Sequence, residues 1–153
     1  MTDETLYGTR LIGQTEKTLS AILDRLLTGS GVTEPQWVAL TVTVNQGAAP
    51  ATAAAERVAA SLKISPRAGA AVLTSLIESG LVEIDDAGTT SVSRTGHELY
   101  QRVHGHVAEI TGRVWGDIPA DERETAASVL HTTLLRAAAE LTALAPDATR
   151  DEA

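Results

Sequence analysis

The residue best placed for chemistry in this 153-residue chain is Arg67, because of what precedes it. Ser65 is a good helix N-cap, and Pro66 suits the first helical position, where its missing N–H is not needed. Arg67 then lies at the N-terminal end of a predicted helix, where the helix dipole and the guanidinium both favour a nearby phosphate. The alternative is an ordinary solvated arginine on the protein surface.

A second group of side chains could line a pocket for a small aromatic or apolar ligand. Tyr100 and His104 share one face of a predicted helix, and the start of the chain adds another aromatic ring and an arginine. The six candidate ligand-binding residues are Tyr7, Arg10, Leu11, Trp37, Tyr100 and His104. Arg10 could pair with a carboxylate on the ligand. The alternative is that the rings pack at a protein interface and that Arg10 is solvated.

The chain lacks the motifs of common catalytic and metal sites. It has no cysteine, no Gly-rich phosphate loop, and neither a G-x-S-x-G nor an H-E-x-x-H sequence. His104 and His106 point to different helix faces, so they cannot share a metal ion from one helix. We therefore expect no metal, no cofactor and no enzyme activity. A general base at one of these histidines is the only argument for an enzyme.

Residues 58–96 predict two short helices joined by a tight turn and followed by a β-hairpin. The first helix ends near Leu62, and the second carries apolar residues at helical spacing until Gly80, which suits a left-handed C-cap. Residues 81–84 and 90–93 predict the strands of the hairpin. This is the order of a winged helix-turn-helix, whose second helix usually lies in the major groove of DNA.

The predicted second helix and its surroundings hold the candidate contacts to double-stranded DNA. Arg67, Lys63 and Arg94, and more weakly Arg57, offer positive charge to phosphates. Small side chains offer apolar contact to thymine methyl groups, although alanine more often merely fills a helix. The candidate DNA-binding residues are Lys63, Ser65, Arg67, Ala68, Ala70, Ala71, Thr74 and Arg94.

Earlier helices are also predicted, each with its own start signal. The first helix runs from about residue 5 to residue 27. The second opens at Thr33, which forms a capping box with Gln36. After a loop over residues 46–51, Thr52 can cap the first helix of the helix-turn-helix.

Two helices follow the hairpin, and their apolar stripes exceed what a small winged helix can bury. The first is capped either by Ser93 or by a box from Thr95 to Glu98, and it runs to about Gly116. The last carries leucine and alanine at helical spacing. This surplus surface needs a partner, and the simplest one is the same surface of a second copy in a twofold homodimer.

The predicted fold class is mainly α with a small β-hairpin wing, in one domain. The winged helix-turn-helix occupies residues 33–96, dimerisation helices occupy 5–30 and 97–145, and a disordered tail covers 146–153. The net charge is −8, and residues 46–96 form the least acidic part without being a basic patch. The lack of a signal-like or 18-residue apolar run predicts a cytoplasmic protein without membrane contact.

Four short segments carry a pattern in a fixed order. Residues 32–40 read V-T-E-P-Q-W-V-A-L, residues 58–65 read V-A-A-S-L-K-I-S, residues 80–82 read G-L-V and residues 92–96 read V-S-R-T-G. They resemble the L-T-x-x-Q-(W/F)-x-x-L helix, the L-A-x-x-L-x-I-S turn, and the G-L-V and L-T-x-x-G ends of the wing in MarR family bacterial transcriptional regulators. The resemblance covers roughly residues 5–145. It implies an obligate homodimer that binds a palindromic operator, often with a small-molecule pocket between its dimerisation and DNA-binding parts.

Some positions depart from the pattern of that family. Ala70 and Ala71 stand where the family usually presents Thr and Arg, and Gly69 replaces an aliphatic residue, which weakens the helix by about 1 kcal/mol. The wing tip at residues 85–89 is acidic and lacks the family's arginines. Two hypotheses follow: a homodimeric regulator, more often a repressor, released from DNA by a ligand, and a dimer that has lost DNA reading and binds a small molecule.

Overall fold

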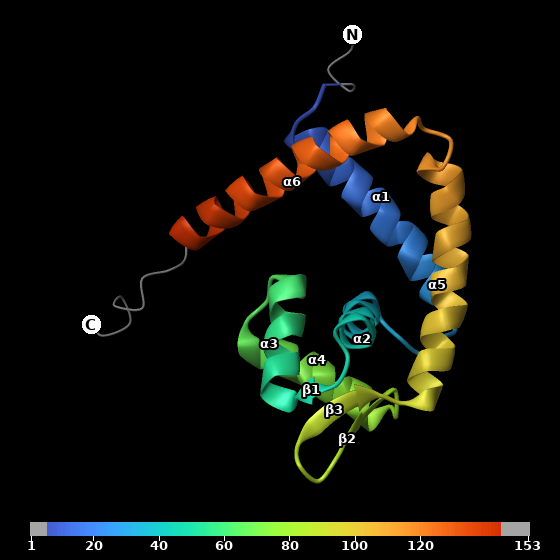
Figure 1. Cartoon of the computed structure of the whole chain (residues 1–153), viewed down its shortest axis with the longest axis vertical. Coiled ribbons are helices and arrows are strands. Elements are labelled where there is room, and N and C mark those ends of the chain that lie inside the picture. The colour runs from blue at the N-terminus through green and yellow to red at the C-terminus, as the bar shows by residue number, and fades with distance from the viewer. Residues whose placement is uncertain (1–5, 145–153) are drawn as a thin grey trace. The chain divides into compact units, whose positions relative to one another are not determined.

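The computed structural model describes residues 6–144, and within that range it contains six α-helices and three short strands (Figure 1). In chain order these are α1 (Thr9–Leu27), α2 (Glu34–Gln46), β1 (Ala49–Pro50), α3 (Ala51–Leu62), α4 (Pro66–Glu78), β2 (Val82–Ile84), β3 (Thr89–Val92), α5 (Arg94–Trp115) and α6 (Ala120–Ala143). The predicted class, mainly α with a small β wing, is confirmed. The first helix begins at Thr9, later than predicted, since residues 6–8 are not helical. The expected tail at 146–153, residue 5 of the expected first helix and residue 145 of the expected last helix lie outside the described residues.

The chain divides into two compact units, residues 1–110 and residues 111–153. The first unit contains α1 to α4, the sheet and most of α5. The second contains the end of α5 and all of α6.

The predicted helix-turn-helix is formed by α3 and α4. α3 ends at Leu62, and its C-cap is Lys63, whose φ of 57° makes it the one non-glycine residue with a left-handed backbone among those described. The Ile64 N–H then donates to the Ala59 carbonyl oxygen (3.1 Å). Ser65 caps α4 as predicted, since its Oγ accepts a hydrogen bond from the Ala68 N–H (3.1 Å). The turn between the helices is therefore fixed by local hydrogen bonds.

α4 ends in a Schellman motif at Gly80, whose φ is 78°. The Gly80 N–H donates to the Ile77 carbonyl oxygen (3.1 Å), and the Leu81 N–H donates to the Leu76 carbonyl oxygen (3.0 Å). Leu76 and Leu81 are both buried in the same hydrophobic cluster, which is the apolar pairing that often accompanies this motif. The chain thus turns directly from α4 into β2.

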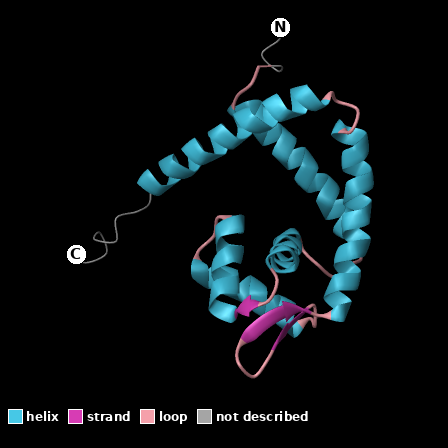
Figure 2. Ribbon diagram, in the orientation of Figure 1, coloured by secondary structure: helices cyan, strands magenta, loops and turns pink. Residues whose placement is uncertain are grey.

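The wing is a three-stranded antiparallel sheet of order β1-β3-β2 (Figure 2). β2 and β3 pair as predicted. The prediction of a loop over residues 46–51 is wrong at its ends, since Gln46 belongs to α2 and Ala51 to α3. It is also wrong for Ala49 and Pro50, because Ala49 pairs with Thr90 and accepts a hydrogen bond from Thr90 Oγ1 (2.9 Å). A two-residue strand is too short for a period-2 pattern to appear in the sequence. Thr52 lies inside α3 and does not cap it, since the N-cap position is Pro50.

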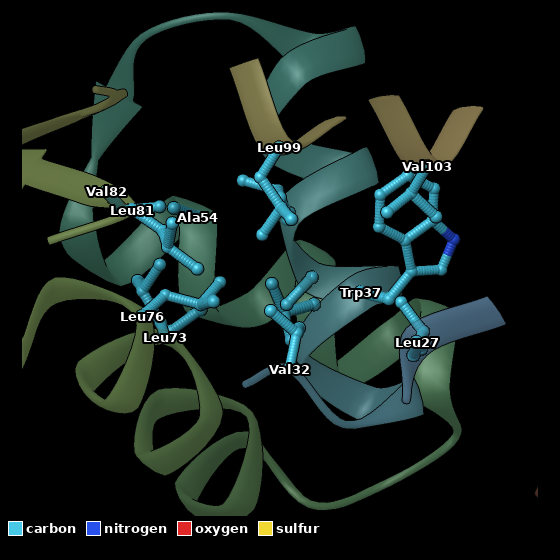
Figure 3. Packing of buried hydrophobic residues seen from close by; sticks show 14 of the residues in the cluster. Leu27, Val32, Trp37, Ala54, Leu73, Leu76, Leu81, Val82, Leu99 and Val103 are labelled. Carbon is cyan, nitrogen blue, oxygen red and sulfur yellow. The ribbon is translucent and has the colours of Figure 1, made fainter. Parts of the chain in front are cut away.

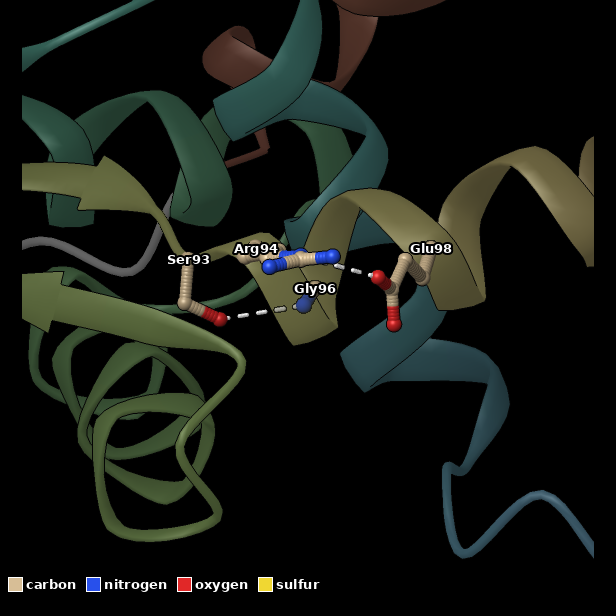
Figure 4. A network of polar contacts seen from close by, with 4 residues as sticks. All are labelled: Ser93, Arg94, Gly96 and Glu98. Atoms are coloured by element: carbon tan, nitrogen blue, oxygen red, sulfur yellow. Dashed lines mark hydrogen bonds and ion pairs between the residues drawn. The ribbon is translucent and has the colours of Figure 1, made fainter.

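Ser93 joins the wing to α5, so of the two predicted caps the structure has this one (Figure 4). Its Oγ accepts a hydrogen bond from the Gly96 N–H (3.0 Å) and donates one to the Gly80 carbonyl oxygen (2.6 Å). Gly96 is buried, and a Cβ there would collide with the Leu81 carbonyl oxygen. The start of α5 is therefore fixed against the corner between α4 and β2.

Replacing Ser93 with alanine should lower the free energy of unfolding by about 1–2 kcal/mol, since α5 loses its N-cap and the Gly80 carbonyl loses a donor. Equilibrium unfolding in urea measures the change. The control is Ser91→Ala in β3, where no hydroxyl hydrogen bond is found within residues 6–144, and where we expect a change below about 0.5 kcal/mol. Equal losses in the two variants would contradict the role given to Ser93.

The hydrophobic core of the first unit is built almost entirely from aliphatic side chains (Figure 3). It joins the end of α1 to α2, α3, α4, the hairpin and the first half of α5. Its larger members are Leu27, Val32, Trp37, Leu40, Val58, Leu73, Leu76, Leu81, Val82, Leu99 and Val103. This core holds α4 so that its other face is left on the surface.

Candidate nucleic-acid interface

α4 has one buried face and one exposed face. Its buried residues are Gly69, Leu73 and Leu76. Four of the predicted DNA contacts are exposed on it: Arg67, Ala70, Ala71 and Thr74. The exposed face therefore offers one guanidinium, one hydroxyl and two alanine methyl groups.

Gly69 allows α4 to approach α3 closely. A Cβ on Gly69 would lie 2.7 Å from both the Ala55 carbonyl oxygen and the Ala59 Cβ. The sequence indicated only the low helix propensity of glycine at this position. The structure shows that the missing side chain sets the distance between the two helices, and hence the position of the exposed face of α4.

The other predicted DNA contacts differ in how available their side chains are. Lys63 is exposed at the turn, whereas the Ser65 oxygen is already occupied as a cap and Ala68 is half-buried. The Arg94 side chain is 93% exposed, and its Nε lies 3.2 Å from Glu98 Oε1 (Figure 4). Because that pair is solvated, it contributes little to stability, but it offsets the charge that Arg94 presents to a phosphate.

Asp85 builds the tip of the wing. Its Oδ1 accepts hydrogen bonds from the Ala87 N–H (3.0 Å) and the Thr89 N–H (2.9 Å), which is an Asx-type turn. Gly88 adopts a φ of 82° in the same turn. Asp86 is exposed beside it. Two carboxylates and no arginine make this tip repulsive to phosphate.

A groove of about 390 Å³ lies between α3, α4 and β2, and no pattern in the sequence had indicated it. Its lining is mainly apolar and includes Ala70 and Thr74 of the exposed α4 face. Ile84 is 47% exposed at this groove, and Glu56 is the one charged residue in its lining. The sequence shows only an isoleucine, Ile84, at the end of a predicted strand. That residue indicates a groove only when the position of α3 beside it is known.

Three of the six candidate ligand-binding residues form a continuous aromatic stack. The Trp37 and Tyr100 ring centroids are 5.5 Å apart at 17°, and those of Tyr100 and His104 are 5.2 Å apart at 15°. Trp37 is only 7% exposed, Tyr100 is half-buried and His104 is exposed. The stack thus runs from the core to the surface. The other three candidates, Tyr7, Arg10 and Leu11, are exposed at the start of α1 and just before it.

In the second unit, α6 has no buried residue. Its large apolar side chains are exposed, namely Val129, Leu130, Leu134, Leu135 and Leu141, and Leu144 follows them directly. An apolar stripe of this length on a single chain is the kind of surface that proteins cover with a partner.

Residues 6–144 contain no group of three or more His, Asp or Glu side chains that could hold a metal ion. In the same range no helix combines the length and the apolar character that crossing a membrane requires.

The helix-turn-helix with a sheet wing, flanked by long helices, places the chain in the winged-helix class of folds. Comparison with solved structures then indicates which family has the same fold. The chain is similar to a MarR family transcriptional regulator of Silicibacter pomeroyi, with 18% identity and a TM-score of 0.68 over 81% of this chain and 85% of that one. It is also similar to a Mycobacterium tuberculosis MarR family protein solved in complex with DNA. The identity is 19% and the TM-score is 0.61, over 81% of this chain and 94% of that one.

BpsR of Bordetella bronchiseptica, whose DNA binding is regulated by 6-hydroxynicotinic acid, shares 18% identity with a TM-score of 0.64 over 87% of this chain and 96% of its own. No protein-family model and no curated protein matches the sequence. The fold is that of the MarR family of transcriptional regulators, as the four sequence segments implied.

Proposed function

We propose that this chain is a MarR-type transcriptional regulator, a cytoplasmic repressor rather than an enzyme, that binds a palindromic operator as a homodimer. The observation that carries the proposal is the exposed face of α4, with Arg67 at a capped helix N-terminus, in a fold shared with regulators. The similar Mycobacterium tuberculosis protein, solved with DNA, supports a nucleic-acid partner.

In this proposal residues 33–96 read the DNA. Arg67 contacts a phosphate or pairs with a guanine edge, while Ala70, Ala71 and Thr74 contact thymine methyl groups. Lys63 and Arg94 add phosphate contacts at either side of α4, with Ser65 and Ala68 at its start. With so few phosphate contacts, DNA binding is weak and is best measured at low salt.

The dimer is proposed from the apolar surface outside the reader. The helices at 5–30 and 97–145 supply its contacts, and the exposed leucines of α6 are the largest uncovered part of them. Twofold symmetry would present two copies of α4, and a palindromic operator requires them about 34 Å apart.

Release from DNA is proposed to come from a small aromatic or apolar ligand at the aromatic stack. Trp37, Tyr100 and His104 offer ring faces, and Tyr7, Arg10 and Leu11 complete the candidate site. The ligand of BpsR, 6-hydroxynicotinic acid, is aromatic and supports this class. A ligand that prefers one dimer geometry would change the spacing of the two α4 helices and lower operator affinity.

The test is a fluorescence-anisotropy titration of the full chain at low salt against DNA flanking its own gene, with shuffled DNA as the control. We expect preference for the flanking DNA and a slope of log affinity against log salt no steeper than about −7, from four phosphate contacts in each subunit. Equal binding to the shuffled DNA would reject the proposed function. A steeper slope would mean that phosphate contacts other than those of Arg57, Lys63, Arg67 and Arg94 dominate.

The acidic wing and the Arg94–Glu98 pair favour a second candidate, a dimer that binds the small molecule and has lost DNA reading. It predicts ligand binding with no DNA preference at any salt concentration. Operator binding that disappears in Arg67→Ala would exclude it.

A further inference from the structure

Besides the core packing of Leu73 and Leu76, two contacts of different kinds hold α4 against its neighbours. Near its start, Gly69 lies against the α3 backbone. Near its end, the Gln36 Nε2 of α2 donates a hydrogen bond to Ser75 Oγ of α4 (3.1 Å). Both side chains in this second contact are half-buried. Ala70, Ala71 and Thr74 lie between the two contacts and Arg67 lies just before the first of them, at the Gly69 end, so the orientation of this exposed face depends on both.

The Gln36 side chain serves two structures at once. Its Oε1 accepts a hydrogen bond from the Thr33 N–H (2.9 Å), while the Gln36 N–H donates to Thr33 Oγ1 (3.4 Å), which forms the capping box of α2. Its Nε2 is left to bind α4, and Ser75 Oγ donates its own proton to the Val72 carbonyl oxygen (2.6 Å). Because the cap fixes the amide oxygen, the amide nitrogen must face Ser75.

The next residue in α2 is Trp37, the buried end of the aromatic stack. Gln36 and Trp37 are neighbours in the first turn of α2, so a displacement of this turn that moves the buried indole also moves the backbone that carries the Gln36 amide. We propose that Gln36 is a positioning residue that transmits the state of the Trp37–Tyr100–His104 stack to α4. When the three rings are stacked, the Gln36–Ser75 hydrogen bond holds the second half of α4 in place. When the rings are displaced, this hydrogen bond is lost. The consequence for DNA rests on the proposed function, whereas the link between the stack and α4 does not.

The first test removes the acceptor on α4 and follows amide hydrogen exchange of residues 70–78 in the full chain. Ser75→Ala should raise these exchange rates about five-fold, as expected for one lost hydrogen bond. Ser79→Ala is the matched control, because its hydroxyl also donates to the carbonyl three residues earlier but makes no hydrogen bond to another helix among the described residues. Equal changes in Ser75→Ala and Ser79→Ala would overturn the proposal.

The second test asks whether the link carries information from the stack. Tyr100→Leu removes the middle ring, and it should raise α4 exchange in the wild-type background but add little in Ser75→Ala, since the link is already broken there. Additive effects would show that stack and α4 are independent, and would reject the positioning role. Operator affinity, measured in parallel, should fall about five-fold in Ser75→Ala and stay constant in Ser79→Ala. Absence of DNA binding in every variant would reject the proposed function and leave the exchange result to decide this inference.

Discussion

Replacing Gly69 with alanine is expected to lower the free energy of unfolding by about 2–3 kcal/mol, although alanine is the better helix former. The new Cβ would lie 2.7 Å from the Ala55 carbonyl oxygen and 2.9 Å from the Ala59 nitrogen. Both are backbone atoms, so no side-chain rotation can relieve the contact. α4 would have to move away from α3 and out of the core. Urea unfolding followed by circular dichroism measures the loss.

The matched control for this change is Gly105→Ala in α5. A Cβ at Gly105 would meet no atom within 4 Å, so only helix propensity remains, and we expect stability to rise by up to about 1 kcal/mol. The two substitutions therefore differ in sign. Stabilisation by both would mean that α3 and α4 are not packed as closely as described.

Replacing Arg67 with alanine is expected to reduce operator affinity by about 30-fold or more while leaving stability unchanged. The side chain is exposed, and each lost arginine contact is worth about 1–3 kcal/mol, counted twice in a dimer. Arg67→Lys separates two modes, because lysine keeps a point charge for a phosphate but cannot form the bidentate contact with guanine. Anisotropy titrations at constant salt measure both variants.

The control for charge alone is Arg102→Ala. This variant removes an exposed arginine of α5 that is not one of the candidate DNA contacts. We expect a loss of no more than a few-fold, from the change in net charge. If Arg102→Ala weakened binding as much as Arg67→Ala, the effect would be general electrostatics. An unchanged affinity in Arg67→Ala would exclude reading of DNA through α4.

The sequence predicted those parts of the fold that depend on neighbours along the chain. The Thr33 and Gln36 box, the Ser65 cap and the left-handed Gly80 each need hydrogen bonds that span five residues or fewer. Such bonds follow from residue type and spacing alone. The helix-turn-helix and its hairpin were therefore recognisable from the order of residues.

Features that depend on distant segments were not predictable in the same way. β1 exists because Ala49 finds Thr90, and the role of Gly69 appears only when α3 is placed beside it. The choice of Ser93 as the cap was settled by Gly80, which lies thirteen residues earlier and accepts its hydrogen bond. Arg94 and Glu98 are different, since their four-residue spacing was a sufficient signal for the ion pair, which was nevertheless not predicted.

The Ser93 hydroxyl and the buried Gly96 connect the end of α4 directly to the start of α5. The hairpin of β2 and β3 links α4 to α5 along the chain, but the contact between the two helices does not involve the tip of this hairpin. The charge of its tip, residues 85–89, can therefore change without changing how α5 meets α4. A side chain at Gly96, by contrast, would collide with the Leu81 carbonyl oxygen and separate the two helices.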